Sequence, residues 1–204
     1  TFKNVSQRFC PTGNPRVEIW QQGKIWPNDK DIEDIKPFVI FSSHHSGAFN
    51  RIAFKEWQLV GTCKNTIDNY FHQTKRARNV IRILKKTANQ LKNVNIVFRP
   101  HPTSDPEIWR TTFNDTPNIF VMDSGSISKY IQESIGVVHS GCTSAFEALL
   151  ARKPFAYLHD DEGKFASETL HVSTSQFKIL TPRDLLYFIH KCKDNGSLPN
   201  AEAV

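Results

Sequence analysis

Residues 137–150 read Val137-Val138-His139-Ser140-Gly141-Cys142-Thr143-Ser144-Ala145-Phe146-Glu147-Ala148-Leu149-Leu150. A short apolar run ends in small polar residues and then enters a helical pattern. The stretch therefore predicts a buried strand, a tight turn and the start of a helix. Such a turn presents backbone N–H groups and hydroxyls at a helix N-terminus, which favours an anion, most often a phosphate.

The polar residues of this turn are the first candidates for a binding site. The groups that can reach a bound phosphate are those of Ser140, Gly141, Cys142, Thr143 and Ser144. Glu147 follows one helical turn later, where its carboxylate can accept from a ribose hydroxyl. A structural alternative stays open, in which Thr143 or Ser144 only caps the helix and Glu147 closes a capping box.

Length and composition limit the classes of protein that fit. The chain has 204 residues, which suits one domain or one domain with an appendage. No apolar run approaches the roughly 18 residues that span a bilayer, and no signal-peptide pattern opens the chain. The four cysteines are scattered without CxxC spacing, which argues against a zinc ribbon and fits a reducing compartment. We therefore expect a cytoplasmic protein.

The net charge is +6, and much of it lies between Lys75 and Lys92. Such a run is most often the solvated face of a helix. It also suits nucleic acid or anionic lipid headgroups, or peripheral contact of an enzyme with the inner face of the cytoplasmic membrane.

Strand and helix patterns alternate along the chain. Apolar runs predict strands, and apolar residues at helical spacing predict helices. The expected strands are residues 37–43, 96–98, 118–123, 136–139, 154–158 and 177–180. The expected helices are residues 65–91, 105–113, 126–133, 182–193 and the one that follows the 140–144 turn, while residues 27–36 read as a loop or linker. This order predicts a Rossmann-like, three-layer α/β domain with a mainly parallel sheet.

Two further strands also end in polar residues. Open α/β sheets bind ligands at the carboxyl ends of their strands. The first strand leads into Ser42-Ser43-His44-His45-Ser46-Gly47, from which we expect Ser43, His44, Ser46 and Gly47 to line the cleft. Adjacent histidines on an extended chain point to opposite sides, so no metal is expected there. An acidic loop at residues 159–164 is expected to be an ordinary solvated turn, and the alternative is that it holds a metal or supplies a catalytic carboxylate.

The second strand leads into Arg99-Pro100-His101-Pro102. The two prolines stiffen the exit from the strand. Arg99 and His101 can then hold a diphosphate and stabilise charge on a leaving group. The structural alternative is a rigid surface turn with an ion pair to Asp105 or Glu107.

Three motifs in fixed order carry a family resemblance. They are Thr12-Gly13-Asn14-Pro15-Arg16, Arg99-Pro100-His101-Pro102 and His139 to Ala148, followed by Lys153-Pro154. From about residue 9 to about residue 190, the chain resembles the C-terminal half of bacterial surface-carbohydrate biosynthesis proteins, which are similar to GT-B glycosyltransferases.

The resemblance implies roles for particular residues. His101-Pro102 resembles the His-Pro motif of bacterial sialyltransferases and polyol-phosphate polymerases, which contacts the phosphate of a cytidine nucleotide. Thr143 and Ser144 resemble the paired hydroxyls that grip the same phosphate, and Glu147 matches the acidic residue that holds the donor ribose. Asn14 and Arg16 would lie in the hinge that enters this domain.

The implied protein is the donor-binding domain of a glycosyltransferase in surface polysaccharide synthesis, with Arg99 and His101 as catalytic residues. The donor is a CMP- or UDP-linked sugar, with no metal or other cofactor and no specific nucleic acid partner. A glycan or lipid-linked acceptor would bind a missing N-terminal domain, which would also supply the general base. Because the chain begins with Thr1, we expect a fragment in which residues 1–36 form a hinge or linker, 37–194 the domain and 195–204 a tail.

The motifs also depart from the family pattern. Cys142 stands where a small or hydroxyl residue is more usual, and the acidic run 160–163 lies in the wrong half to be the general base. Two alternatives remain open. One is a non-hydrolysing nucleotide-sugar 2-epimerase-like enzyme, whose catalytic carboxylates would come from the absent half. The other is a non-catalytic nucleotide- or polyanion-binding module that uses the basic helix.

Overall fold

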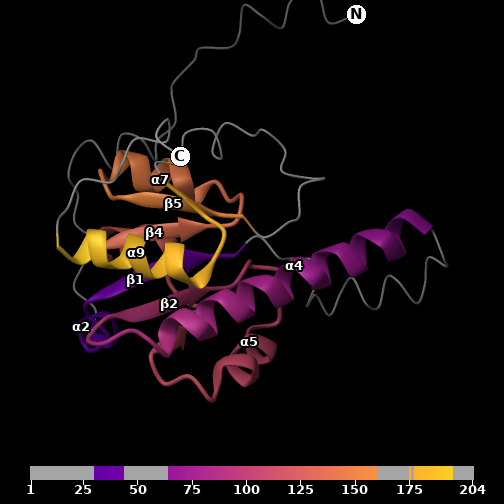
Figure 1. Cartoon of the computed structure of the whole chain (residues 1–204), viewed down its shortest axis with the longest axis horizontal. Coiled ribbons are helices and arrows are strands. Elements are labelled where there is room, and N and C mark those ends of the chain that lie inside the picture. The colour runs from indigo at the N-terminus through magenta and orange to yellow at the C-terminus, as the bar shows by residue number, and fades with distance from the viewer. Residues whose placement is uncertain (1–29, 44–63, 160–174, 176, 195–204) are drawn as a thin grey trace, which may run out of the picture.

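The computed structural model describes residues 30–43, 64–159, 175 and 177–194. Within these residues, six strands form one sheet in the order β3-β2-β1-β4-β5-β6, and every neighbouring pair is parallel (Figure 1). The strands are β1 (Phe38–Ser42), β2 (Asn95–Arg99), β3 (Ile119–Val121), β4 (Gly136–His139), β5 (Phe155–Leu158) and β6 (Phe177–Ile179). This is the strand order of a Rossmann fold, so the predicted fold class is confirmed.

Apart from α2, the helices also lie close to the predicted ranges. They are α2 (Lys30–Glu33), α4 (Lys64–Ala88), α5 (Pro106–Phe113), α6 (Ile127–Glu133), α7 (Ser144–Leu150) and α9 (Pro182–Lys193). Local caps explain several of the starts. Asp105 accepts a hydrogen bond from the backbone N–H of Glu107 ahead of Pro106, and Thr181 forms a capping box with Asp184.

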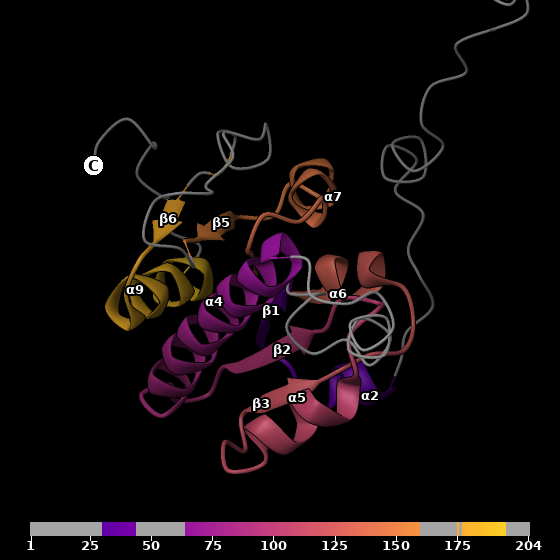
Figure 2. The same cartoon turned by 90° about the vertical axis from the view of Figure 1, so that its right-hand side faces the viewer.

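Helices cover both faces of the sheet because the strands are apolar on both sides. Along β1, Val39 and Phe41 point into the cluster that contains buried residues of α4, α5 and α9, and Phe38 and Ile40 point into the cluster with α2, α6 and α7. Figure 1 shows α4 and α9 in front of the strands, and Figure 2 shows α6 and α7 on the other side. The three-layer architecture is therefore confirmed.

One difference from the prediction lies at residues 27–36. The expected loop contains helix α2, and both Ile32 and Ile35 are buried in the core beneath α6 and α7. The acidic residues beside and between these isoleucines are exposed, namely Asp31, Glu33 and Asp34. A four-residue helix is too short to produce a recognisable apolar period.

The strand order also locates the place where a ligand can bind. β1 pairs with β2 on one side and with β4 on the other, so the connections that follow β1 and β4 leave the sheet in opposite directions. A crevice opens at the carboxyl ends of such strands. In the described part of the chain, no helix combines the length and apolar character needed to cross a membrane.

Candidate functional site

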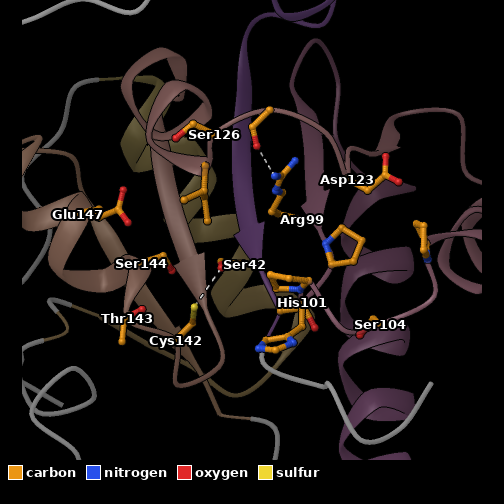
Figure 3. Close-up of a pocket in the computed structure, with 16 residues that line it drawn as sticks. Ser42, Arg99, His101, Ser104, Asp123, Ser126, Cys142, Thr143, Ser144 and Glu147 are labelled. Atoms are coloured by element: carbon orange, nitrogen blue, oxygen red, sulfur yellow. Dashed lines mark hydrogen bonds between the residues drawn. The ribbon is translucent and has the colours of Figure 1, made fainter. Parts of the chain in front are cut away.

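A pocket of about 560 Å³ lies at the carboxyl ends of β1, β2 and β4. It is lined by residues that follow each of these strands and by the start of α6 (Figure 3). The polar and titratable members are Ser42, Ser43, Arg99, His101, Ser104, Asp123, Ser126, Cys142, Thr143, Ser144 and Glu147. The crevice that the strand order predicts is therefore a real cavity, and it collects residues from all three predicted strand ends.

The turn after β4 is held by His139, which is fully buried. The backbone N–H of Gly141 donates to His139 Nδ1 at 3.2 Å, and His139 Nε2 lies 2.8 Å from Ser175 Oγ. Because Nδ1 accepts, the neutral ring carries its proton on Nε2 and donates to Ser175. Gly141 has φ +92, a conformation that side chains other than glycine rarely adopt. His139 and Gly141 together therefore set the direction in which the chain enters α7.

The structure decides against the capping interpretation of this turn. Thr143 occupies the N-cap position of α7 in a helical conformation, and its side chain makes no capping hydrogen bond. Ser144 is 2% exposed, and its Oγ has no hydrogen-bond partner among the residues that the structure describes. A buried hydroxyl without a partner costs about 1–3 kcal/mol, so it needs an explanation. Because Ser144 lines the pocket, a bound ligand can supply that partner.

Glu147 lies on the same wall of the pocket and is 6% exposed. Its Oε2 accepts a hydrogen bond of 2.5 Å from Ser128 Oγ, which comes from α6. A buried carboxylate oriented in this way can accept hydrogen bonds from a ligand hydroxyl. Ser128 is not recognisable as a site residue from the sequence, because a serine inside a helix gives no signal of a partner 19 residues away.

Arg99, on the opposite wall, uses its side chain in a way that the sequence did not predict. Its guanidinium donates to the carbonyl oxygens of Met122 at 2.9 Å and Gly125 at 2.5 Å, and also to that of Ser124. It also lies over the ring of Tyr130, 5.5 Å from the centroid. Burial lowers the pKa of this guanidinium, which stays charged. Arg99 therefore joins the end of β2 to the loop before α6, rather than to the carboxylates at 105 or 107.

His101 lies near the centre of the pocket in Figure 3. The backbone N–H of Thr103 donates to its Nδ1 at 3.2 Å, and Thr103 Oγ1 lies 2.8 Å from the same atom. This assigns the proton of the neutral ring to Nε2. Partial burial lowers the pKa of His101 from its ordinary value, so the ring is neutral at pH 7. A neutral imidazole can still donate a hydrogen bond from Nε2 to a phosphate oxygen.

Cys142 and Ser42 connect the two sides of the pocket floor. Ser42 Oγ donates to Cys142 Sγ at 3.4 Å, and Cys142 is a free, half-buried thiol. This contact gives one physical reason for a cysteine at a position where a hydroxyl is more usual. Ser43 is buried beside them and lines the same cavity.

Several predicted site residues lie elsewhere. Ser140 is buried and, like Gly141, is not among the residues that line the pocket, so their contribution is to the turn itself. His44, Ser46 and Gly47 of the expected sugar loop lie outside the described residues, as do Asn14 and Arg16 of the expected hinge. Residues 160–164 of the acidic loop also lie outside them. Within the described ranges, no three His, Cys, Asp or Glu side chains gather as metal ligands would.

Comparison with known proteins finds likeness in structure rather than in sequence. No protein-family model matches the chain, and no curated protein matches it. The solved structures that share the fold include the following three. A Staphylococcus aureus protein, MnaA, solved with UDP, has a TM-score of 0.53 at 12% identity, over 90% of this chain and 45% of that one.

The second is a Listeria monocytogenes protein assigned as a UDP-N-acetylglucosamine 2-epimerase, with a TM-score of 0.54 at 10% identity over 97% of this chain and 52% of that one. The third is a UDP-N-acetylglucosamine 2-epimerase with a TM-score of 0.51 at 10% identity, over 93% and 46%. The chain thus spans about half the length of these proteins.

These likenesses correct one prediction and confirm another. The prediction of glycosyltransferase activity is wrong, because the neighbours whose activity is stated are 2-epimerases and not glycosyltransferases. The motifs do not distinguish these activities, because Rossmann domains of one kind occur in enzymes that catalyse different reactions. The reacting groups can lie in another half of the protein. At 10–12% identity the comparisons establish the fold, which is the Rossmann-like half of a GT-B-type architecture.

Proposed function

We propose that this chain is the nucleotide-sugar-binding domain of a larger enzyme, with a UDP-sugar as its ligand and 2-epimerisation as the reaction of the whole protein. The observation that carries the proposal is the buried hydroxyl of Ser144, which lacks a partner among the described residues and lines the pocket at the switch point of the sheet. A phosphate oxygen would accept from this hydroxyl. The UDP found with the Staphylococcus aureus protein of the same fold supports the choice of base.

The other pocket residues fit the parts of a nucleoside diphosphate. His101 donates from Nε2, and Thr143 adds an exposed hydroxyl near Ser144. Glu147 offers a carboxylate to the ribose from the same wall as Ser144 (Figure 3). Since α7 has only seven residues, these individual donors would contribute more than its dipole. Their summed hydrogen bonds would stabilise the diphosphate without a metal.

Calorimetric titration of the folded chain with UDP, UDP-N-acetylglucosamine and CMP at moderate salt tests this proposal. We expect saturable binding of the uridine ligands, weakened about tenfold by Ser144→Ala, because one hydrogen bond to a charged group is worth about 1.5 kcal/mol. His101→Gln should weaken binding in the same direction.

The matched control is Ser134→Ala, which removes a buried hydroxyl at the other edge of the sheet that donates to the carbonyl of Ile131 at 2.9 Å. This variant should bind UDP as the wild type does. A folded chain that binds no uridine nucleotide, or that binds equally well after Ser144→Ala and His101→Gln, contradicts the proposal. Conversion of UDP-N-acetylglucosamine to its 2-epimer by the full-length protein, followed by proton NMR, tests the reaction separately.

A second candidate, a polyanion-binding module, has one observation in its favour. Residues 71–88 of α4 contain six Lys and Arg and no Asp or Glu, and Arg78, Arg82 and Lys86 are exposed at helical spacing. Binding to this face would fall steeply with salt and show no preference among bases. The same titration at two salt concentrations, with heparin as the probe, separates the two candidates.

A further inference from the structure

The strongest unexplained feature of the pocket is the set of contacts behind it, which link three elements. Glu147 lines the pocket, whereas Ser128, which donates to its Oε2, does not. Ser128 is itself 6% exposed. A short hydrogen bond from a buried hydroxyl to a carboxylate fixes the rotation of that carboxylate. Ser128 therefore acts on the ligand-facing group from the side away from the ligand.

The position of Ser128 depends on the loop before α6. Ser126 is the N-cap of α6, and its Oγ accepts from the backbone N–H of Ser128 at 3.3 Å. Residues 122–126 form the connection between β3 and α6, which we call the 122–126 loop. Gly125 in this loop has φ +73, so the loop turns sharply just before the helix.

Arg99 holds the 122–126 loop to the sheet. Its three donated hydrogen bonds reach the carbonyls of Met122, Ser124 and Gly125, and its guanidinium covers the ring of Tyr130 in α6. A planar guanidinium can serve several acceptors at fixed angles, whereas a lysine ammonium cannot reproduce that pattern. The contacts thus run from Arg99 in β2 through the loop to Ser128 and on to Glu147 in α7.

We propose that Ser128 and Arg99 are positioning residues that hold Glu147 in the orientation in which it accepts from a ribose hydroxyl. The inference rests on the proposed function, because it concerns the same pocket. It assigns to Arg99 a role through the 122–126 loop, rather than direct contact with the leaving phosphate. Loss of either residue should therefore weaken recognition of the ribose more than recognition of the diphosphate.

The test compares the affinity of the folded chain for UDP with its affinity for 2′-deoxy-UDP, and includes inorganic diphosphate as a third probe. We expect the wild type to prefer UDP by about tenfold, the value of one hydrogen bond to a carboxylate. Ser128→Ala and Glu147→Gln should each reduce this preference to about twofold or less. Ser128→Cys should behave like Ser128→Ala, because a thiol is a weak donor, and Ser128→Thr should restore the preference.

The matched control is again Ser134→Ala, because Ser134 is buried at the other end of the same helix. It should leave the UDP to 2′-deoxy-UDP ratio unchanged. A Ser128→Ala variant that keeps the wild-type ratio, while Glu147→Gln loses it, overturns the role of Ser128. If Arg99→Lys weakens diphosphate and UDP equally and leaves the ratio unchanged, Arg99 contacts phosphate directly and its positioning role is wrong. Absence of UDP binding by folded wild type overturns the proposed function itself, which separates the two failures.

Discussion

At the amino ends of the strands, three polar side chains are paired with other parts of the protein. Lys36 Nζ lies 2.5 Å from Glu133 Oε2, Lys153 Nζ donates to the carbonyl of Ser134 at 2.8 Å, and Asn95 Nδ2 donates to the carbonyl of Ile35 at 2.8 Å. At the carboxyl ends, by contrast, Ser144 keeps a buried hydroxyl that no described residue bonds. These three side chains at the amino edge are thus bonded within the protein, whereas Ser144 at the carboxyl edge presents its hydroxyl to a cavity.

The two ends of the strands therefore differ in role: polar groups at the amino ends contribute to stability, and those at the carboxyl ends are available for binding. Burial of Lys153 lowers the pKa of its ammonium, and the carbonyl it contacts helps to offset that cost. At the carboxyl edge, the buried hydroxyl of Ser144 would gain a partner when a ligand binds. Substitutions at the amino edge should therefore change the free energy of unfolding and leave UDP binding intact, while Ser144→Ala at the carboxyl edge should weaken UDP binding without lowering that free energy.

The largest expected effect is that of Gly136→Ala at the amino end of β4. A Cβ at this position would lie 2.7 Å from Cys192 Sγ and 3.3 Å from Phe188 Cζ, in a region with little free space. Overpacking of this kind costs about 1–3 kcal/mol. We expect urea denaturation to show a loss of about 2 kcal/mol, with the affinity for UDP unchanged at temperatures where the variant is folded.

Cys192→Ala tests whether the close contact with Cys192 Sγ causes the loss of stability in Gly136→Ala. Cys192 is a free thiol that burial keeps protonated, with its pKa raised to about 12, so its side chain acts as an apolar group. Removal of Sγ makes room for the new methyl group. The double variant should therefore lose less stability than the sum of the two single variants by about 1 kcal/mol. Strict additivity would show that the contact with Sγ does not explain the effect.

At the carboxyl edge, the affinity for UDP should depend on pH through the imidazole of His101. Because burial lowers the pKa of His101 below 6.5, the ring is neutral at pH 7 and a bound diphosphate should raise that pKa. UDP affinity should then increase about threefold to tenfold as pH falls from 7.5 to 5.5, beyond the change that protonation of UDP itself produces. His101→Gln, measured over the same range, provides that baseline. A wild-type profile parallel to that of His101→Gln would contradict contact between His101 and phosphate.

The lowered pKa of His101 also predicts that the stability of the unliganded protein changes with pH in the opposite direction to its affinity for UDP. A histidine whose folded pKa lies below its unfolded value stabilises the folded state above about pH 6.5. That contribution is lost as pH falls through 6.5 toward the folded pKa. Unliganded protein should therefore become less stable over the range in which UDP binds more tightly, and His101→Gln should reduce both trends.

The sequence predicted most of the fold because each strand is a short apolar run bounded by Gly, Pro or polar residues. It also located the three strand ends that meet in the pocket. It did not predict α2, whose Ile32 and Ile35 are separated by acidic residues and look like a polar linker. It did not predict the hydrogen bonds of Arg99 to the backbone carbonyls of the 122–126 loop, because such contacts depend on tertiary structure and leave no trace in residue types.

The smallest expected effect tests whether the two edges are truly independent. Helix α7 begins at the pocket with Ser144 and ends at Leu150 near the amino edge, and Arg152, just beyond its C-cap, has φ +54. There the N–H groups of Arg152 and Lys153 donate to the carbonyls of Leu149 and Ala148 at 3.0 and 2.9 Å, the Schellman pattern that favours glycine. Arg152→Gly should therefore raise stability by about 0.5–1 kcal/mol in urea denaturation. Since Ser144 and Glu147 belong to the same short helix, an accompanying change in UDP affinity would show that the two edges are coupled through α7, and unchanged affinity would show that stability and binding can be altered separately.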